Sequence, residues 1–277
     1  MTLRRTTRGL WLCAHPIPTI GVTALSAGLA ALADLDLRTG LLFTAVVLLG
    51  QLSIGWSNDA LDAARDRASG RSDKPVASGS VPQRAVAGAA VAALLAAVAL
   101  SLPLGPRSAA ATSTLAVAGW LYNLGLKNSA LSFLPYAIGF AALPAGAVLA
   151  RPDHPWPAWW LPAAGAVLGI AAHAANVLPD LEADRATGVN GFFHHLGARA
   201  TAVAGPVLLV LASALALFGP GEVRAWKWSA IAAIMLLAGV GLAVGITRPG
   251  SKVLFLATIV LAGIDLLLFA SSGTAVT

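Results

Sequence analysis

The stretches NDALDAARDRASG (residues 58–70) and NVLPDLEADRATG (residues 176–188) carry one pattern twice. Each has Asn, Asp and Asp spaced four residues apart, followed by Arg and then Gly, and the copies begin 118 residues apart (176 minus 58). Residues at i, i+4 and i+8 of an α-helix advance by roughly 40° per step, so each set is expected to form one stripe. Two such stripes facing each other would hold hard cations, and a pair of cations suits a diphosphate.

The remainder of the chain is strongly apolar. Of its 277 residues, 57% are apolar and 11% are charged, and the mean hydropathy is +0.78. A soluble domain of this length carries far more charge, so the composition predicts an all-α, polytopic membrane protein. We expect a bundle of about nine membrane-spanning helices. The predicted spans cover residues 17–33, 41–57, 85–104, 108–124, 131–150, 158–178, 200–218, 228–246 and 252–271.

Basic residues outnumber acidic ones, 18 against 12, but their placement argues against nucleic acid as a partner. They segregate by loop: with the N-terminus inside, thirteen fall on the cytoplasmic side and five on the outer side. This distribution follows the positive-inside rule. We therefore expect an integral protein of a bacterial-type plasma membrane, with the N-terminus and both acidic motifs facing the cytoplasm.

The duplicated motif predicts a duplicated bundle. The first copy closes the second predicted span and the second copy closes the sixth, so residues 10–128 and 129–247 would be two halves, with a ninth helix at 252–271. Because both copies lie on one side, the halves would be parallel repeats about a pseudo-twofold axis along the membrane normal. We expect a single domain over residues 1–277; the sequence does not indicate the oligomeric state.

The oxygen-bearing side chains of the two motifs predict a Mg²⁺ site. Mg²⁺ prefers oxygen ligands and is usually held by a few carboxylates together with substrate phosphate. Carboxylates at membrane depth are costly unless they are neutralised, which a bound metal would do. The competing interpretation is that these acids cap helices or pair with nearby Arg, and the duplication argues against it. The predicted metal-binding residues are Asn58, Asp59, Asp62, Asp66, Asn176, Asp180 and Asp184.

A metal-bound diphosphate in an apolar cavity indicates one reaction class. The C–O bond of an allylic diphosphate ionises, and the cation is trapped by a nucleophile or rearranges. Metal ions act as Lewis acids and as a template, and apolar walls exclude water. Basic residues near the motifs would neutralise the diphosphate, although each also fits the role of a positive-inside anchor. The candidate substrate-binding residues of this kind are Arg67, Arg71, Lys74, Lys127 and Arg185.

These residues resemble a known family. Asn58-Asp59-x2-Asp62-x3-Asp66 resembles the first Asp-rich motif of the UbiA-type intramembrane prenyltransferases, and Asp180-Leu-Glu-Ala-Asp184 resembles their second. Tyr122-Asn-Leu-Gly-Leu-Lys127 resembles their Tyr/Lys segment, with one more residue between Tyr and Lys than the commonest form. Lys74-Pro75 with Gly79 resembles the basic stretch after the first motif. The resemblance covers roughly residues 10–270, and the two Asp-rich motifs are specific only together.

The resemblance implies an enzyme that transfers a polyprenyl group from a polyprenyl diphosphate to a small-molecule or lipid acceptor. It implies nine helices around a cavity that opens laterally to lipid, with the diphosphate bound through two Mg²⁺ ions. In that picture Lys127, Arg71 and Lys74 face the diphosphate, and Tyr122 lies near the leaving oxygen. The implied catalytic residues are Asp62, Asp66, Asp180, Asp184, Tyr122 and Lys127.

Several histidines depart from the family pattern or have no clear counterpart in it. His15-Pro16 stands where the family often has Arg-Pro, and His194-His195 occupies the loop after the second motif, which carries Arg in many relatives. Adjacent histidines point apart on a helix, so we interpret the pair as part of a lid rather than as metal ligands. His173 lies seven residues before Asp180 and is either a base for the acceptor or a hydrogen-bonded core residue.

Two other functions stay open from the sequence. A terpene cyclase would use the same metal and diphosphate site without an acceptor. A transporter would use the carboxylates to bind ions, and parallel repeats suit that class too. The placement of both acidic clusters on one side, each beside a basic, Gly-rich loop, favours the prenyltransferase. Neither the acceptor nor the length of the prenyl chain can be derived from the sequence.

Overall fold

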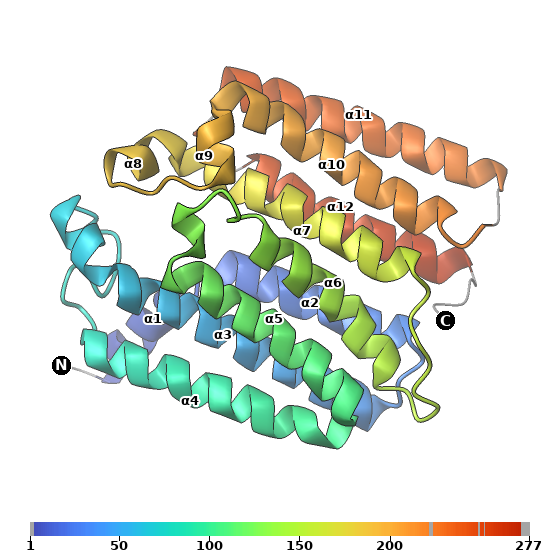
Figure 1. Cartoon of the computed structure of the whole chain (residues 1–277), viewed down its shortest axis with the longest axis horizontal. Coiled ribbons are helices and arrows are strands. Elements are labelled where there is room, and N and C mark those ends of the chain that lie inside the picture. The colour runs from blue at the N-terminus through green and yellow to red at the C-terminus, as the bar shows by residue number, and fades with distance from the viewer. Residues whose placement is uncertain (1–2, 222–223, 249, 252, 273–277) are drawn as a thin grey trace.

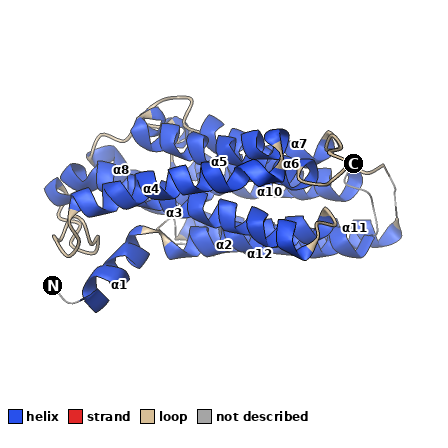
Figure 2. Cartoon of the chain, turned by 90° about the horizontal axis from the view of Figure 1, so that it is seen from below, coloured by secondary structure: helices blue, strands red, loops and turns tan. Residues whose placement is uncertain are grey.

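The computed structural model describes residues 3–221, 224–248, 250–251 and 253–272, and within these ranges the chain is helical and contains no strand (Figure 2). This confirms the all-α class. Figure 1 shows the helices running side by side along one axis. The elements are α1 (Leu3–Cys13), α2 (Pro16–Leu32), α3 (Leu37–Ala68), α4 (Gln83–Ser101), the 3₁₀ turn η1 (Leu102–Leu104), α5 (Pro106–Leu124), η2 (Leu126–Asn128), α6 (Leu134–Leu149), α7 (Trp160–Val177), η3 (Leu178–Asp180), α8 (Leu181–Ala186), α9 (Phe192–Leu196), α10 (Ala198–Phe218), α11 (Ala225–Thr247) and α12 (Val253–Ser272).

A helix lies over each of the predicted spans. In the described residues, five helical segments are long and apolar enough to cross a membrane: Leu37–Ala68, Gln83–Leu104, Trp160–Ala186, Ala198–Phe218 and Ala225–Thr247. A sixth results if the N-terminal segment Thr7–Cys13 and α2, which meet at 71°, form one broken span. Leu134–Leu149 and Val253–Ile264 are apolar but shorter. The polytopic class is confirmed, whereas the number nine stays a prediction.

The bend between α1 and α2 has a local cause. Pro16 disfavours the right-handed helical region for the residue before it, and His15 adopts φ 51° and ψ 72° instead. The chain leaves α1 at an angle to the bundle, as Figure 2 shows. This places the His15 side chain next to α3, where it contacts Asp59.

Helix α3 extends well past the predicted span of 41–57. Its N-terminus is capped by Asp36, whose Oδ1 accepts hydrogen bonds from the backbone N–H groups of Arg38 at 3.0 Å and Thr39 at 3.1 Å. The helix continues for 32 residues and stops shortly before Gly70, which has φ 70°. Because the helix is unbroken from Asn58 to Asp66, the first Asn-Asp-Asp set forms the predicted stripe.

The second set does not lie on one continuous α-helix, which corrects the prediction of two equivalent stripes. Helix α7 ends at Val177, and residues 178–180 form a 3₁₀ turn before the short helix α8 begins. Pro179 lacks the backbone N–H that would donate a hydrogen bond in an α-helix. In an α-helix its ring would also clash with the carbonyl group four residues earlier. Asn176, Asp180 and Asp184 therefore belong to three successive elements.

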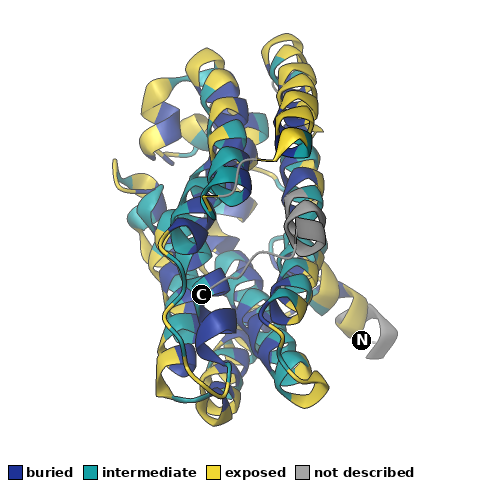
Figure 3. Ribbon diagram, turned by 90° about the vertical axis from the view of Figure 1, so that its right-hand side faces the viewer, coloured by how far each residue is buried: buried dark blue, intermediate teal, exposed yellow. Residues whose placement is uncertain are grey.

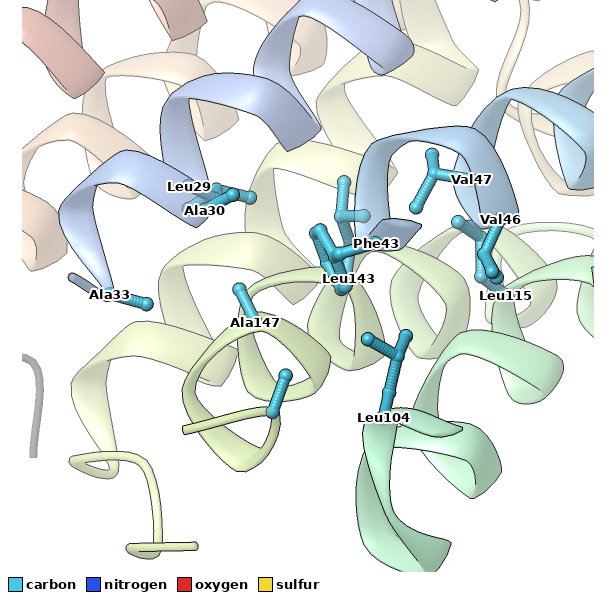
Figure 4. Packing of buried hydrophobic residues seen from close by; sticks show 11 residues of the cluster. Leu29, Ala30, Ala33, Phe43, Val46, Val47, Leu104, Leu115, Leu143 and Ala147 are labelled. Atoms are coloured by element: carbon cyan, nitrogen blue, oxygen red, sulfur yellow. The ribbon is translucent and has the colours of Figure 1, made fainter. Parts of the chain in front are cut away.

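Close helix packing positions these elements. One apolar cluster joins α2, α3, α5 and α6 through residues such as Leu29, Phe43 and Leu143 (Figure 4). Helices α6 and α7 approach so closely that a Cβ added to Gly165 would lie 2.3 Å from the Phe140 carbonyl oxygen. Small residues at membrane helix interfaces permit this kind of approach.

The outward faces are apolar as well. Leu37, Leu95 and Leu236 are 78%, 64% and 71% exposed, and Figure 3 shows exposed residues along the outer surfaces of the helices. Large apolar side chains that cover the outside of a bundle are suited to lipid contact.

The two predicted halves have corresponding neighbours. Helix α3 packs on α2 and α4, and α7 packs in the same way on α6 and α10. The end of α3 and the short helices α8 and α9 lie at the same end of the bundle in Figure 1. Corresponding neighbours, and acidic motifs at the same end of the bundle, are features that a parallel repeat requires. The boundaries of the two repeats stay predictions.

Candidate active site

The first motif presents three buried carboxylates. Asp59, Asp62 and Asp66 are 2%, 7% and 3% exposed, near the end of α3. A buried carboxylate needs opposite charge or hydrogen-bond donors, since an isolated buried charge is very costly. The partners come from four separate parts of the chain.

Asp62 is neutralised by two basic side chains. Its Oδ2 accepts a hydrogen bond from Arg65 at 2.7 Å, and its Oδ1 accepts one from the Nζ of Lys127. Asn58 also donates to Oδ2 at 3.2 Å. Lys127 lies in η2, so this contact joins the predicted Tyr/Lys segment to the first motif.

Asp59 and Asp66 share Lys74, which follows the end of α3 by six residues. Its Nζ lies 2.7 Å from Oδ1 of Asp59 and 3.5 Å from Oδ2 of Asp66. His15 Nε2 contacts the same Oδ1 of Asp59 at 3.0 Å. His15 and Lys74 therefore both contact one carboxylate oxygen of Asp59.

The electrostatics of these basic side chains differ. Burial acts to lower the pKa of Lys74, but the carboxylates of Asp59 and Asp66 together outweigh it and raise the pKa above the usual value. Burial lowers the pKa of Lys127 despite the nearby charge of Asp62. The Lys127 side chain is also the less exposed of the two, at 7% against 14% for Lys74.

Asn123 organises the inner face of the site, although the sequence analysis did not identify it as functional. Its Nδ2 donates to the Ile54 carbonyl at 2.9 Å and to Ser57 Oγ at 2.8 Å. Its Oδ1 accepts from Asn58 Nδ2 at 3.3 Å. The only feature of the sequence that could have drawn attention to Asn123 is its position directly after Tyr122, within the Tyr/Lys segment.

The second motif is more open. Asn176 and Asp180 are exposed, and Asp184 is partly buried. Asn176 Nδ2 donates to the Tyr136 hydroxyl at 3.4 Å, and His194 Nε2 lies 3.3 Å from Oδ2 of Asp184. Among the described contacts none involves the Asp180 carboxylate. Asp180 is thus more accessible than the three buried aspartates of the first motif.

The motifs act on common neighbours. Burial alone would lower the pKa of Arg71, but the charge of Asp73 raises it above the usual value, and Asp180 and Asp66 act in the same direction. The carboxylates of Asp62 and Asp184 both lie within electrostatic range of the Tyr122 hydroxyl. One acid of each motif therefore contributes to the electrostatic environment of Arg71, and one of each to that of Tyr122.

An aromatic cluster borders the carboxylates. His173 stacks on Tyr136 with ring centroids 4.6 Å apart, and the edges of Tyr122 and Phe193 approach His173 at 5.4 and 5.2 Å. His173 Nε2 lies 3.1 Å from Ser132 Oγ. Aromatic faces attract cations, so this cluster is suited to stabilising positive charge beside the acidic site.

An apolar cavity of about 80 Å³ lies between α2, α6, α7, α10 and α12. Leu29, Phe140, Trp160, Leu168 and Ala212 are among its lining residues. The lining is almost wholly hydrocarbon, so the cavity suits an apolar ligand rather than water.

Comparison with known proteins identifies the family. The profile of the UbiA prenyltransferase family matches residues 19–254. The chain belongs to this family. The predicted family and enzyme class, prenyltransferase, are thereby confirmed. Among curated proteins, none matches the sequence.

Solved structures of UbiA proteins share the fold. A UbiA homologue from Archaeoglobus fulgidus bound to GPP and Mg²⁺ superposes with a TM-score of 0.74 at 14% identity, covering 96% of this chain and 98% of that one. An apo UbiA homologue from Aeropyrum pernix K1 gives 0.72 at 18% identity, covering 90% and 97%. A structure described as digeranylgeranylglyceryl phosphate synthase gives 0.68 at 17% identity, covering 96% and 98%.

Two predicted diphosphate contacts of this UbiA protein have other partners. The Arg67 guanidinium lies 3.5 Å from Gln83 Oε1, and we find no contact between it and a motif carboxylate in the described residues. Arg185 donates to the backbone carbonyl of His194. We therefore interpret Arg67 as a surface residue and Arg185 as a support for the loop after the second motif.

The donor set suits Mg²⁺ without forming a complete cage. In the described part of the chain, no three His, Cys, Asp or Glu side chains are grouped closely enough to hold a metal ion alone. Mg²⁺ usually binds through one or two carboxylates with substrate phosphates and waters completing the octahedron. The clustered carboxylate and amide oxygens of this UbiA protein meet that requirement.

Proposed function

We propose that this protein transfers a polyprenyl group from an allylic polyprenyl diphosphate to a small-molecule or lipid acceptor, in a Mg²⁺-dependent reaction within the membrane. The observation that carries the proposal is a chain of contacts between the two motifs: Lys127 donates to Asp62, and its backbone carbonyl packs on Gly191. The N–H of Gly191 in turn donates to His194, which lies beside Asp184. Mg²⁺ and prenyl diphosphate in the Archaeoglobus fulgidus homologue support the same assignment.

The residues divide into those that would hold the metal and those that would hold the diphosphate. Asn58, Asp62, Asp180 and Asp184 would bind Mg²⁺, and Asp66 and Asn176 would support them. Asp59 is already engaged by Lys74 and His15, so its role is to hold these two side chains in place. When bound, Mg²⁺ would neutralise the charge that develops on pyrophosphate.

The basic side chains would act on the leaving group. Lys127, Arg71 and Lys74 donate to phosphate oxygens as the C–O bond breaks and its electron pair moves to pyrophosphate. The Tyr122, Tyr136 and His173 rings face the allylic cation and exclude water that would consume it. The acceptor supplies the electron pair for the new bond and then loses a proton.

The domain organisation and orientation form part of the proposal. Residues 1–277 would be one domain with two parallel repeat halves. Lys and Arg cluster at the end of the bundle that holds the site, including Arg65, Arg71, Lys74 and Lys127. Because positive charge is retained on the cytoplasmic side, the site would open to the cytoplasm of a bacterial-type plasma membrane.

The test uses purified protein in lipid nanodiscs. Prenyl diphosphates are supplied with Mg²⁺, with or without candidate acceptors, and pyrophosphate release and product mass are measured. We expect a prenylated product only with an acceptor, and no release after EDTA treatment. A cyclic hydrocarbon formed without acceptor would instead establish a cyclase. Ion flux in proteoliposomes without pyrophosphate release would establish a transporter.

A further inference from the structure

Both ring nitrogens of His194 have hydrogen-bond partners. Its side chain is 2% exposed in the short helix α9, after the second motif. The backbone N–H of Gly191 donates to Nδ1 at 3.1 Å, so Nδ1 cannot itself carry the proton in this arrangement. The proton is therefore on Nε2, and Nε2–H donates to Oδ2 of Asp184 at 3.3 Å.

The backbone around His194 is held from several directions. Arg185 donates to the His194 carbonyl, and Thr201 Oγ1 donates to the Phe193 carbonyl at 3.1 Å. Ser132 Oγ accepts from the Phe192 N–H at 2.8 Å. These contacts fix the imidazole through its own backbone, so the ring is a rigid donor.

The loop is also packed tightly against the first half of the site. A Cβ added to Gly191 would lie 2.6 Å from both the Lys127 carbonyl oxygen and Ser132 Oγ. The residue that orients the imidazole thus touches the backbone of the predicted diphosphate-binding Lys127. The position of His194 is coupled to both motifs through this contact.

We propose that His194 is a positioning residue that orients the Asp184 carboxylate for metal binding. The hydrogen bond from the imidazole to Oδ2 restricts rotation of the Asp184 carboxylate and so fixes the direction of Oδ1. The described hydrogen bonds include none to Oδ1, which leaves this oxygen available to a metal ion. Hydrogen-bond donors behind a metal ligand fix its orientation and raise its affinity for the metal. The inference rests on the proposed Mg²⁺ site, and it assigns a function to a histidine that the sequence analysis placed in a lid.

The neighbouring histidine provides a matched control. His195 is adjacent in the same helix but exposed, and none of the described contacts joins its side chain to a motif acid. A replacement at position 195 alters the same helix and the same residue type. It leaves the contact with Asp184 in place.

The experiment measures Mn²⁺ binding to the full-length protein in nanodiscs by electron paramagnetic resonance, with inorganic pyrophosphate present. His194→Phe keeps an aromatic ring and removes both nitrogens, whereas His194→Gln retains an N–H donor. We expect Mn²⁺ affinity to fall about 10- to 100-fold in His194→Phe, to recover largely in His194→Gln, and to stay unchanged in His195→Phe. His194→Leu is the replacement if thermal unfolding shows that His194→Phe does not fold.

Turnover provides the second readout. A positioning role predicts that the Mg²⁺ concentration for half-maximal activity rises in His194→Phe, while kcat at saturating Mg²⁺ is largely restored. Wild-type Mn²⁺ affinity in folded His194→Phe or His194→Leu would overturn the inference and leave the proposed function intact. An absence of Mn²⁺ binding in the wild-type protein would overturn both.

Discussion

Lys127 Nζ donates a hydrogen bond to Oδ1 of Asp62 across 65 residues of sequence. Both side chains are buried, and the side-chain atoms alone are 7% exposed in Lys127 and 8% in Asp62. The contact joins the α5–α6 connection to the first acidic motif and places a cation where the diphosphate is proposed to bind. Mutation of either residue is therefore expected to affect both the stability of the fold and the proposed reaction, and the two effects can be measured separately.

Asp62→Ala is expected to reduce both turnover and stability. The variant lacks a proposed metal ligand, so kcat should fall by about 100-fold or more. It also leaves Lys127 without its carboxylate, and removing one partner of a buried pair costs about 3–5 kcal/mol. Pyrophosphate release and thermal unfolding measure the two effects. Asp153→Asn, in an exposed loop, is the control that should change neither; near-normal turnover in Asp62→Ala would contradict the metal assignment.

Asp180→Ala is expected to separate activity from stability. Asp180 is exposed and has no partner among the described contacts, so its removal should change the free energy of unfolding by no more than about 0.5 kcal/mol. Turnover should nevertheless be lost to a similar degree as in Asp62→Ala, because both acids are proposed to hold Mg²⁺. A stable Asp180→Ala protein with normal turnover would exclude this acid from the site.

Lys127→Met is expected to weaken diphosphate binding. Methionine preserves most of the length of the lysine side chain and removes its charge. A hydrogen bond to a charged group contributes about 1.5–3 kcal/mol. The inhibition constant of pyrophosphate should therefore rise by roughly 10- to 100-fold. Arg84→Met, an exposed cation at the start of α4, serves as the control for net charge. Unchanged inhibition in Lys127→Met would remove Lys127 from the diphosphate site.

The sequence predicted the helices well because a membrane span has a strong local signal. Hydropathy ends the predicted span at residue 57, because Asp59, Asp62 and Asp66 are polar, and only the spacing of the acids predicted that the helix continues through them. In the folded protein Lys74 and Lys127 neutralise these acids, so the helix continues through them. The break after Val177 could have been expected, because Pro179 lies inside the second motif.

The spacing of the first motif indicates that its acids share one face of a helix, but it does not indicate which side chains pair with each of them. A stripe of acids follows from helical spacing, whereas the loop residue that reaches each carboxylate depends on tertiary packing. His15 meets Asp59 across 44 residues, and Asn123 reaches Ile54 across 69. His194 was placed in a lid because neighbouring histidines diverge on a helix; that divergence is what lets one of them face Asp184.

The last prediction concerns the length of the prenyl chain. Leu168, at the near side of the apolar cavity on α7, precedes Asp180 by 12 residues, which corresponds to about 18 Å of helix. An isoprene unit has four main-chain carbons and extends roughly 5 Å, so a chain of about four units would reach the cavity from the acidic site. Shorter chains would end before it.

Ala212→Phe should therefore shorten the preferred substrate. Ala212 is 4% exposed and lines the cavity, so a phenyl ring at this position would fill space that the end of a long chain would occupy. We expect kcat/KM to fall for the longer prenyl diphosphates and to stay unchanged for those too short to reach the cavity, as measured across a series of increasing length. Leu236→Phe, on the outward face, should leave the profile unaltered. An identical length profile in folded Ala212→Phe would mean that the prenyl chain takes a different path, because a ring in the cavity cannot be bypassed without cost.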